Sequence, residues 1–288
     1  MARKGLSLGE SMVLITGAAQ GMGRLLVERA KREGCCQIVA WDIDAERLAQ
    51  LRQEMCVDER VRLYTQVVDL ADLKAIEAAV VQLQAEFGLP NILINNAGVV
   101  CGDYFWGHRP VEDIQHTMAV NTLAPMQLTR ALLPAMLAGQ KPCRIVNIAS
   151  AAALVSNPKM SVYAASKWAL LGWSDSLRLE LVQAGHAHVK VTTVCPTYIN
   201  TGMFAGAKPL LMTPMLQPDA VVDQIWLAMK AGRPQLLLPW TVRLSKIVKG
   251  LLPLSWWDVV AEKVFKIYDS MSEFKGRAHG PAPADKKD

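Results

Sequence analysis

Short apolar segments alternate with longer amphipathic ones along the first 240 residues, and this alternation limits the possible folds most strongly. Predicted strands lie at 12–16, 37–41, 61–67, 92–94, 144–148, 189–194 and 235–238. Helices are predicted between them, at about 22–33, from 45, at 70–87, 111–138, 161–183 and 219–231. Strands without polar alternation, separated by helices, are typical of a parallel sheet covered on both faces. The sequence therefore predicts an α/β fold with a doubly wound parallel sheet of the Rossmann type.

The chain divides into three segments by composition. Residues 8–239 carry the alternating pattern and form one predicted domain of the Rossmann type, and residues 240–275 form an amphipathic helical tail. Residues 276–288 are rich in Pro, Gly and Lys and are expected to be disordered. Within the domain, residues 197–216 interrupt the pattern with prolines, Met and Leu, which indicates a mobile loop over a site.

Charge and cysteine content argue against several classes of protein. The formal charge is +5 and the pI is about 8.9, but the basic residues are spread along the chain, which does not favour nucleic-acid binding. The six cysteines show neither paired metal-ligand spacing nor a disulfide pattern, so reduced thiols in a cytoplasmic protein are expected. Neither a signal-peptide core nor an apolar run long enough to cross a bilayer is recognisable.

The first predicted strand ends in a glycine-rich segment, Thr16-Gly17-Ala18-Ala19-Gln20-Gly21-Met22-Gly23. Glycine allows the tight turn and the close approach of backbone to a pyrophosphate, and the following helix offers free N–H groups to the phosphates. An isolated cluster of this kind could be an ordinary turn. Its position between the first strand and the first helix favours dinucleotide binding.

Asp42 ends the second predicted strand, about twenty residues after the glycines, where dinucleotide-binding folds place a ribose-binding acid. Its carboxylate can accept hydrogen bonds from both ribose hydroxyls of NAD, and it would repel the 2′-phosphate of NADP. The alternative is that Asp42 caps the next helix, but Asp44 can take that role. NAD is therefore the expected cofactor.

Tyr163 and Lys167 are four residues apart on a predicted helix, so the phenol and the ammonium share one face. Free tyrosine titrates near 10, and a nearby ammonium, helped by a positive nicotinamide ring, would lower that pKa and favour the phenolate. An isolated pair of this kind could be a buried aromatic with a snorkelling lysine. Ser150 and the segment Asn95-Asn96-Ala97-Gly98, however, end neighbouring strands, where open α/β sheets bind ligands.

Together these motifs resemble the short-chain dehydrogenase/reductase family over about residues 10–240. The resemblance implies an oxidoreductase in which Tyr163 is the acid/base, Ser150 orients the substrate oxygen, and Asn121 supports a proton relay through Lys167. Asn96 to Gly98 would lie beside the adenine ribose, Asp69 near the adenine and Thr201 at the carboxamide. The implied cofactor-binding residues are Gly17, Gln20, Gly21, Met22, Gly23, Asp42, Ile43, Asp69, Leu70, Asn96, Ala97, Gly98, Tyr163, Lys167, Pro196, Thr197, Ile199 and Thr201.

Two positions depart from the family pattern. Pro196 is followed by Thr197 where glycine is usual, and Ala124 stands where a glycine is common after Asn121. Neither change removes a catalytic group, but Thr197 adds a side chain near the nicotinamide pocket. The substrate side of the site is therefore expected to have its own shape.

Residues 99–106 and 203–216 are expected to frame the substrate, and their Met, Leu, Phe and Trp side chains favour an apolar alcohol or carbonyl compound. Mutual packing of these side chains is the alternative. A looser resemblance, carried by residues 195–202 and the basic tail, is to the branch with hydroxysteroid, retinol and long-chain alcohol dehydrogenases. A homo-oligomer, dimer or tetramer, is expected. A non-catalytic dinucleotide-binding scaffold or redox sensor is the alternative function.

The tail is expected to form two amphipathic helices. In the first, at 241–251, Leu244, Ile247, Val248 and Leu251 share a face opposite Arg243, Lys246 and Lys249. In the second, at 255–270 and capped by Ser255, the apolar stripe is Trp256, Trp257, Val260, Val264 and Ile267. Tryptophans and lysines in this arrangement suit peripheral contact with a membrane surface, but also packing on a neighbouring subunit or closure of the substrate cleft.

Overall fold

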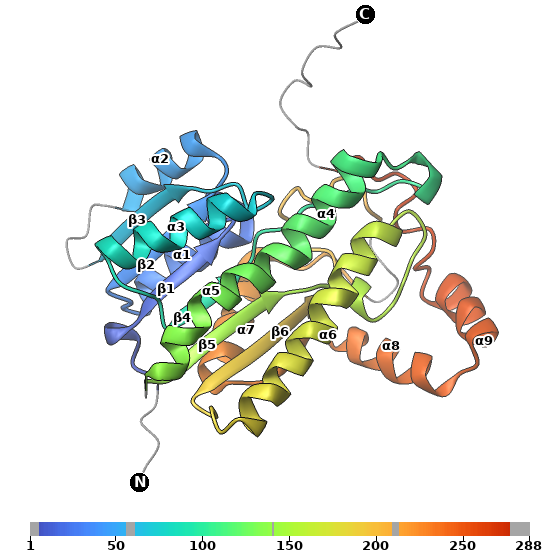
Figure 1. The fold of residues 1–288 in the computed structure, drawn as a ribbon. Coiled ribbons are helices and arrows are strands. Elements are labelled where there is room, and N and C mark those ends of the chain that lie inside the picture. Colours follow the sequence, from blue (N-terminus) through green and yellow to red (C-terminus); the bar gives the residue numbers. More distant parts are fainter. Residues whose placement is uncertain (1–5, 56–60, 140, 209–212, 277–288) are drawn as a thin grey trace, which may run out of the picture.

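A computed structural model describes residues 6–55, 61–139, 141–208 and 213–276 of the chain. The described part contains a seven-stranded sheet, all parallel, with the strand order β3-β2-β1-β4-β5-β6-β7 (Figure 1). The strands are β1 (Met12–Thr16), β2 (Gln37–Asp42), β3 (Arg62–Val67), β4 (Ile92–Asn95), β5 (Cys143–Ile148), β6 (Val189–Pro196) and β7 (Gln235–Leu238). The predicted doubly wound fold and all seven predicted strands are confirmed, with ends shifted by two residues at most.

Helices cover both faces of the sheet, as the apolar strands require. One core cluster joins the sheet to α1 (Gly21–Arg32), α2 (Ala45–Met55) and α7 (Pro218–Ala231) through side chains such as Leu26, Leu51 and Trp226. The other joins the opposite face to α3 (Leu73–Glu86), α5 (Ala124–Ala138) and α6 (Ser161–Gln183). Figure 1 shows α3, α5 and α6 on the side of the sheet that faces the viewer.

The long helical region predicted at 111–138 is confirmed, but its first half is not a regular α-helix. A π-helical turn at Pro110–Gln115, the short α4 (His116–Met118) and a second π-helical turn at Ala119–Leu123 precede α5. Wider turns of this kind often occur at functional sites, and this one holds Asn121. Single turns of 3-10 helix lie at Leu8–Glu10, Phe105–Gly107 and Ala151–Ala153.

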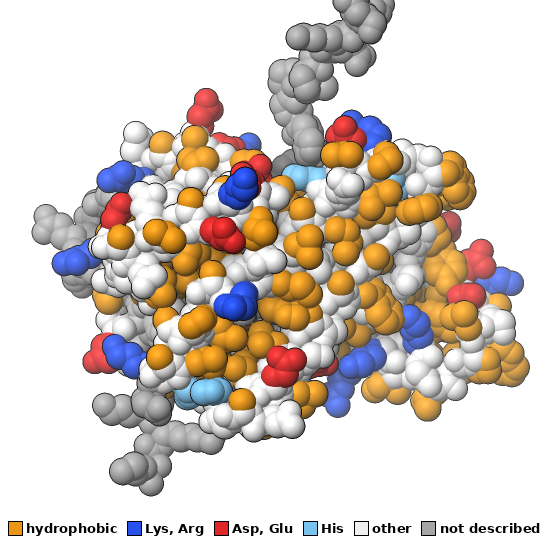
Figure 2. All heavy atoms as spheres, in the orientation of Figure 1, with side chains coloured by type: hydrophobic (Ala, Val, Ile, Leu, Met, Phe, Trp, Pro, Cys, Tyr) orange, Lys and Arg blue, Asp and Glu red, His pale blue; other side chains and the backbone are white. Residues whose placement is uncertain are grey.

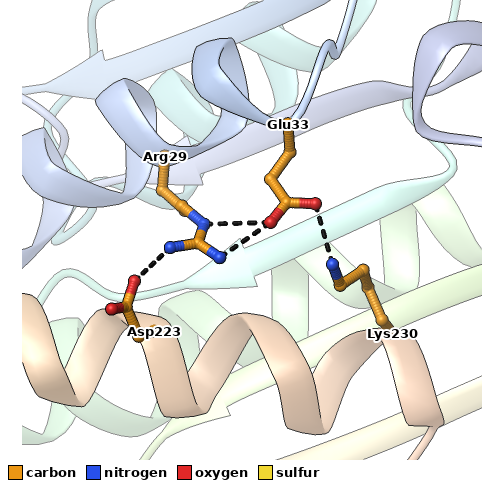
Figure 3. Close-up of polar contacts among 4 residues, drawn as sticks. All are labelled: Arg29, Glu33, Asp223 and Lys230. Carbon is orange, nitrogen blue, oxygen red and sulfur yellow. Dashed lines mark hydrogen bonds and ion pairs between the residues drawn. The ribbon is translucent and has the colours of Figure 1, made fainter.

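A partly buried ion network fixes α1 to α7 (Figure 3). Arg29 donates to Glu33 at 2.7 and 3.1 Å and also to Asp223, while Lys230 donates to Glu33 at 2.8 Å. Burial acts to raise the pKa of Glu33, but the hydrogen bonds from Lys230 and Arg29 outweigh it and lower that pKa. The helix that follows the glycine-rich turn is therefore held at its far end.

The tail forms α8 (Trp240–Leu251), α9 (Leu254–Val259) and a π-helical turn at Val260–Val264. The prediction of a helix through residue 270 is wrong, because Lys266 takes a left-handed backbone conformation (φ 53°) and the chain turns there. Pro253, rather than Ser255, precedes the first residue of α9. No helix in the described part of the chain is long and apolar enough to span a bilayer. The expectation of disorder at 276–288 falls outside the described residues apart from Gly276.

Candidate active site

A long cleft of about 1760 Å³ runs along the carboxyl ends of the strands, across the point between β1 and β4 where the strand order reverses. Of the residues predicted to hold the cofactor, all but Gly23 line this cleft. Its lining also includes residues that the sequence prediction missed, because none of them belongs to a recognisable motif: Asp44, Arg47, Val68, Val99, His116, Val120, Ile148 and Ala149.

The glycine-rich turn has the geometry that a pyrophosphate requires. Gly17 and Gly21 have φ angles of 63° and 55°, a conformation that other residues rarely adopt. Gly23 packs so closely that an added Cβ would lie 1.8 Å from the Gly17 carbonyl oxygen. The N-terminus of α1 therefore reaches the cleft with its N–H groups, which suits binding of phosphate oxygens.

Asn96 holds the turn in place from β4. Its Nδ2 donates to the carbonyl oxygens of Thr16 at 2.9 Å and Gly17 at 3.2 Å. In return, Thr16 Oγ1 accepts the backbone N–H groups of Asn96 and Ala97, each at 3.1 Å. Asn96 lines the cleft as predicted, but these bonds also tie the ends of two adjacent strands together at the topological switch point.

Asp42 lies at the end of β2 with its carboxylate fixed by backbone N–H groups. Oδ2 accepts from Ala19 at 2.9 Å, and Oδ1 accepts from Asp44 at 3.1 Å. Asp44 caps the following helix through Arg47 N–H at 3.0 Å, as the sequence suggested, so Asp42 is available to the cleft. Arg47 extends into the same region and donates to the Gln20 side chain.

Ser150, Tyr163 and Lys167 come together between β5 and α6, all buried. Ser150 acts on Tyr163, because its hydroxyl lowers the pKa of the phenol. Lys167 Nζ donates to the Ile148 carbonyl oxygen at 2.9 Å and lies 5.7 Å from the centre of the Tyr163 ring. The structure therefore assembles the three predicted catalytic groups beside the dinucleotide cleft.

Burial determines the titration of this pair. It raises the pKa of Tyr163 to about 12, with the Ser150 hydroxyl acting in the opposite direction. It also lowers the pKa of Lys167 to about 8. The Lys167 ammonium is not among the groups that shift the pKa of Tyr163 in the protein without cofactor, so the lowering expected with a nicotinamide bound stays a prediction.

Asn121 is fully buried in its π-helical turn and forms two hydrogen bonds with the backbone of Val99. Its Oδ1 accepts from Val99 N–H and its Nδ2 donates to the Val99 carbonyl oxygen, both at 2.8 Å. Nδ2 also donates to Ser166 Oγ at 3.0 Å. A Cβ on Gly98 would lie 3.2 Å from Asn121 Oδ1 and 3.4 Å from Lys167 Nζ, so both polar atoms approach this glycine. The relay role of Asn121 stays a prediction.

A second, mainly apolar cleft of about 670 Å³ adjoins the first. Ser150, Thr197 and Phe204 line both clefts, so they mark where a substrate would meet the cofactor. Thr197 Oγ1 is buried there without a hydrogen-bond partner in the described part of the chain. The remaining lining residues are Ala151, Ala152, Val155, Asn157, Met160, Tyr198, Thr213, Thr241, Val242, Ser245, Phe265 and Ile267.

The residues that line this second cleft correct the prediction that residues 99–106 frame the substrate. They also show that the tail contributes to the cleft, which was one of the alternatives for its role. Residues 99–106 do not line it; Tyr104, Phe105 and Trp106 are exposed, Trp106 at 83%. Phe204 and Thr213 line the cleft, which confirms in part the prediction that residues 203–216 frame the substrate. Residues 209–212 lie outside the described part of the chain. Tail residues form the opposite side of the cleft: Thr241, Val242, Ser245, Phe265 and Ile267. The helical periodicity of the tail alone could not show that these residues belong to the site.

Comparison with known proteins gives the family. The family model for short chain dehydrogenase matches residues 11–209. Estradiol 17-beta-dehydrogenase 11 of Homo sapiens is 33% identical over 274 residues, which cover 94% of this chain and 89% of that protein. Retinol dehydrogenase 10 of Xenopus tropicalis is 32% identical over 281 residues, covering 87% and 81%.

Solved structures agree with these relatives. A short-chain dehydrogenase/reductase from Burkholderia phymatum in complex with NAD has a TM-score of 0.76 at 24% identity, covering 85% of this chain and 95% of that one. A short-chain dehydrogenase from Sphingobium yanoikuyae in complex with NADPH has a TM-score of 0.70 at 26% identity, covering 96% and 100%. The chain belongs to the short-chain dehydrogenase/reductase family. It is an oxidoreductase that acts on alcohol groups with a nicotinamide dinucleotide.

Proposed function

We propose that the chain interconverts a lipophilic alcohol and its ketone or aldehyde, with NAD as the hydride carrier. The observation that carries this proposal is the mainly apolar cleft that meets the dinucleotide cleft at Ser150 and Thr197. Apolar walls with a few polar groups at one point favour a substrate with a single reacting oxygen on an apolar body. Two relatives, named for estradiol and retinol, act by those names on alcohols of this kind.

The bound nicotinamide would exchange a hydride with the alcohol carbon, and the protein handles the proton. The substrate oxygen would lie between the Ser150 hydroxyl and the Tyr163 phenol. In reduction, the protonated phenol, which the raised pKa favours, donates its proton to the new alkoxide. In oxidation, Tyr163 must first lose its proton, and the positive charge of the oxidised nicotinamide would favour that loss. Lys167, with a pKa of about 8, can exchange protons near neutral pH.

Primary and secondary alcohols of increasing apolar length test this proposal with NAD at the nicotinamide absorbance. Each methylene that enters the apolar cleft should raise kcat/KM about fourfold, because its burial contributes about 0.8 kcal/mol. Sugars and hydroxy acids should be poor substrates. Better turnover of polar than of apolar alcohols would contradict the substrate class. Tight dinucleotide binding without turnover of any alcohol or carbonyl compound would favour the non-catalytic scaffold.

Asp42 is expected to favour NAD over NADP by at least about tenfold in kcat/KM. The carboxylate at the cleft would accept the ribose hydroxyls and repel a 2′-phosphate. Asp42→Ser should narrow the preference, while Asp72→Ser, which keeps a capping hydroxyl at the start of α3, should leave it unchanged. Equal or better use of NADP by the unaltered protein would contradict this assignment and point to Arg47 as a phosphate-binding residue.

We also infer a homo-oligomer in a reducing, cytoplasmic compartment. Trp168, Leu179 and Val182 of α6 are large apolar side chains about half exposed, which suits a subunit interface. The described cysteines are all free thiols, in keeping with a reducing environment.

A further inference from the structure

The two tail helices carry apolar side chains on two opposite sides. On the inner side, Val242, Trp257 and Ala261 are buried against the catalytic domain, with Trp257 only 2% exposed. On the outer side, eight large apolar side chains are 39–77% exposed. We call this set the tail face: Trp240, Leu244, Ile247, Leu251, Leu254, Trp256, Val259 and Val264.

The tail face is continuous along α8. Trp240, Leu244, Ile247 and Leu251 follow one another at intervals of four, three and four residues, so they form one stripe on the helix. The residues that line the substrate cleft, Thr241, Val242 and Ser245, lie on the other side of the same helix. The predicted apolar stripe with Leu244, Ile247 and Leu251 is therefore largely exposed to solvent, although the tail packs on the domain and lines the cleft.

Basic residues outnumber acidic residues along the tail. Between residues 240 and 267 there are five basic and two acidic residues. Arg243, Lys246, Lys263 and Lys266 are exposed. Of the acidic residues, Asp258 already accepts a hydrogen bond from Tyr268 at 2.5 Å. Figure 2 shows hydrophobic side chains gathered in this region, with both basic and acidic side chains beside them.

We propose that the tail face docks on an anionic lipid surface. Exposed apolar side chains with tryptophans among them, on a segment that carries more basic than acidic residues, match the chemistry of the boundary between headgroups and acyl chains. The excess of basic residues selects a negatively charged surface as the partner. Resting on the proposed function, this docking would place α8 between the lipid and the substrate cleft. A lipophilic alcohol dissolved in the membrane would then lie close to the site that oxidises it.

Sedimentation with lipid vesicles tests this proposal without any measurement of activity. The full-length protein should pellet with vesicles that contain phosphatidylserine and much less with vesicles of phosphatidylcholine alone. Ile247→Glu with Leu251→Glu should reduce the pelleted fraction at least tenfold, and rising salt should weaken binding of the unaltered protein. Val81→Glu, on an equally exposed apolar side chain of α3, is the matched control and should pellet normally.

Dinucleotide binding and turnover of a short, water-soluble alcohol should be unchanged in the double variant, which shows that it is folded. Failure of the unaltered protein to pellet with anionic vesicles at low salt would overturn the proposal, whatever the enzyme's activity. Equal pelleting of the double variant would also overturn it. If the double variant instead changed the oligomeric state and vesicles were not bound, the tail face would be an interface between copies of this chain.

Discussion

Tyr163→Phe is expected to lower turnover by about two to four orders of magnitude. The change keeps the ring that packs near Phe204 and removes only the hydroxyl that exchanges the proton. Dinucleotide binding should therefore survive, because the glycine-rich turn and Asp42 are untouched. Initial rates at the nicotinamide absorbance give the loss of turnover, and calorimetric titration with NAD gives the affinity.

Tyr64→Phe is the matched control, since Tyr64 is on β3 and packs against Phe87 instead of lining either cleft. It should leave both measurements unchanged. A Tyr163→Phe protein that kept most of its turnover would show that another group moves the proton. Parallel loss of NAD affinity would mean that the phenol contributes to binding as well.

Lys167→Met is expected to abolish most turnover and yet stabilise the protein without cofactor. Burial lowers the pKa of Lys167 from its ordinary 10.5 to about 8, so the charged form is disfavoured in the fold. Such a lysine stabilises the fold most above pH 10.5; this contribution is lost as the pH falls towards 8, and below 8 the penalty is constant. At pH 7 the shift corresponds to about 3 kcal/mol, partly offset by the hydrogen bond to Ile148.

Urea unfolding without cofactor measures this effect. The Met variant should exceed the unaltered protein in unfolding free energy by on the order of 1–3 kcal/mol at pH 7, and the gain should shrink by pH 10. Lys74→Met, at an exposed position on α3, should change neither stability nor turnover. A less stable Lys167→Met protein at pH 7 would contradict the view that burial of this charge is costly.

The sheet and the dinucleotide site could be predicted from the sequence because their signals are local. A parallel strand buried on both faces is a short apolar run, and the glycines, Asp42 and the pair Tyr163 and Lys167 stand at fixed distances from such runs. The carboxyl ends of parallel strands meet at one edge, so motifs far apart in the chain could be expected in one place.

What could not be predicted depends on contacts distant in sequence. The periodicity at 111–138 does not reveal the π-helical turns, one of which holds Asn121 where it hydrogen-bonds to Val99. The raised pKa of Tyr163 reflects burial, which no pair spacing reveals. In the tail, amphipathic spacing identifies two apolar sides but does not say which one the domain covers. The stripe with Leu244 and Ile247 proved to be the outer one.

Because α8 and the chain after α9 close the substrate cleft, the reacting groups and part of the substrate-contacting lining come from separate segments of the chain. The groups that perform the reaction all precede Pro239, whereas Thr241, Val242, Ser245, Phe265 and Ile267 belong to one uninterrupted stretch at the carboxyl end. Changes confined to that stretch can alter which alcohol is accepted without disturbing the groups that react with it. Exchanges within residues 240–267 could therefore generate new selectivities in this protein while the same groups perform the chemistry.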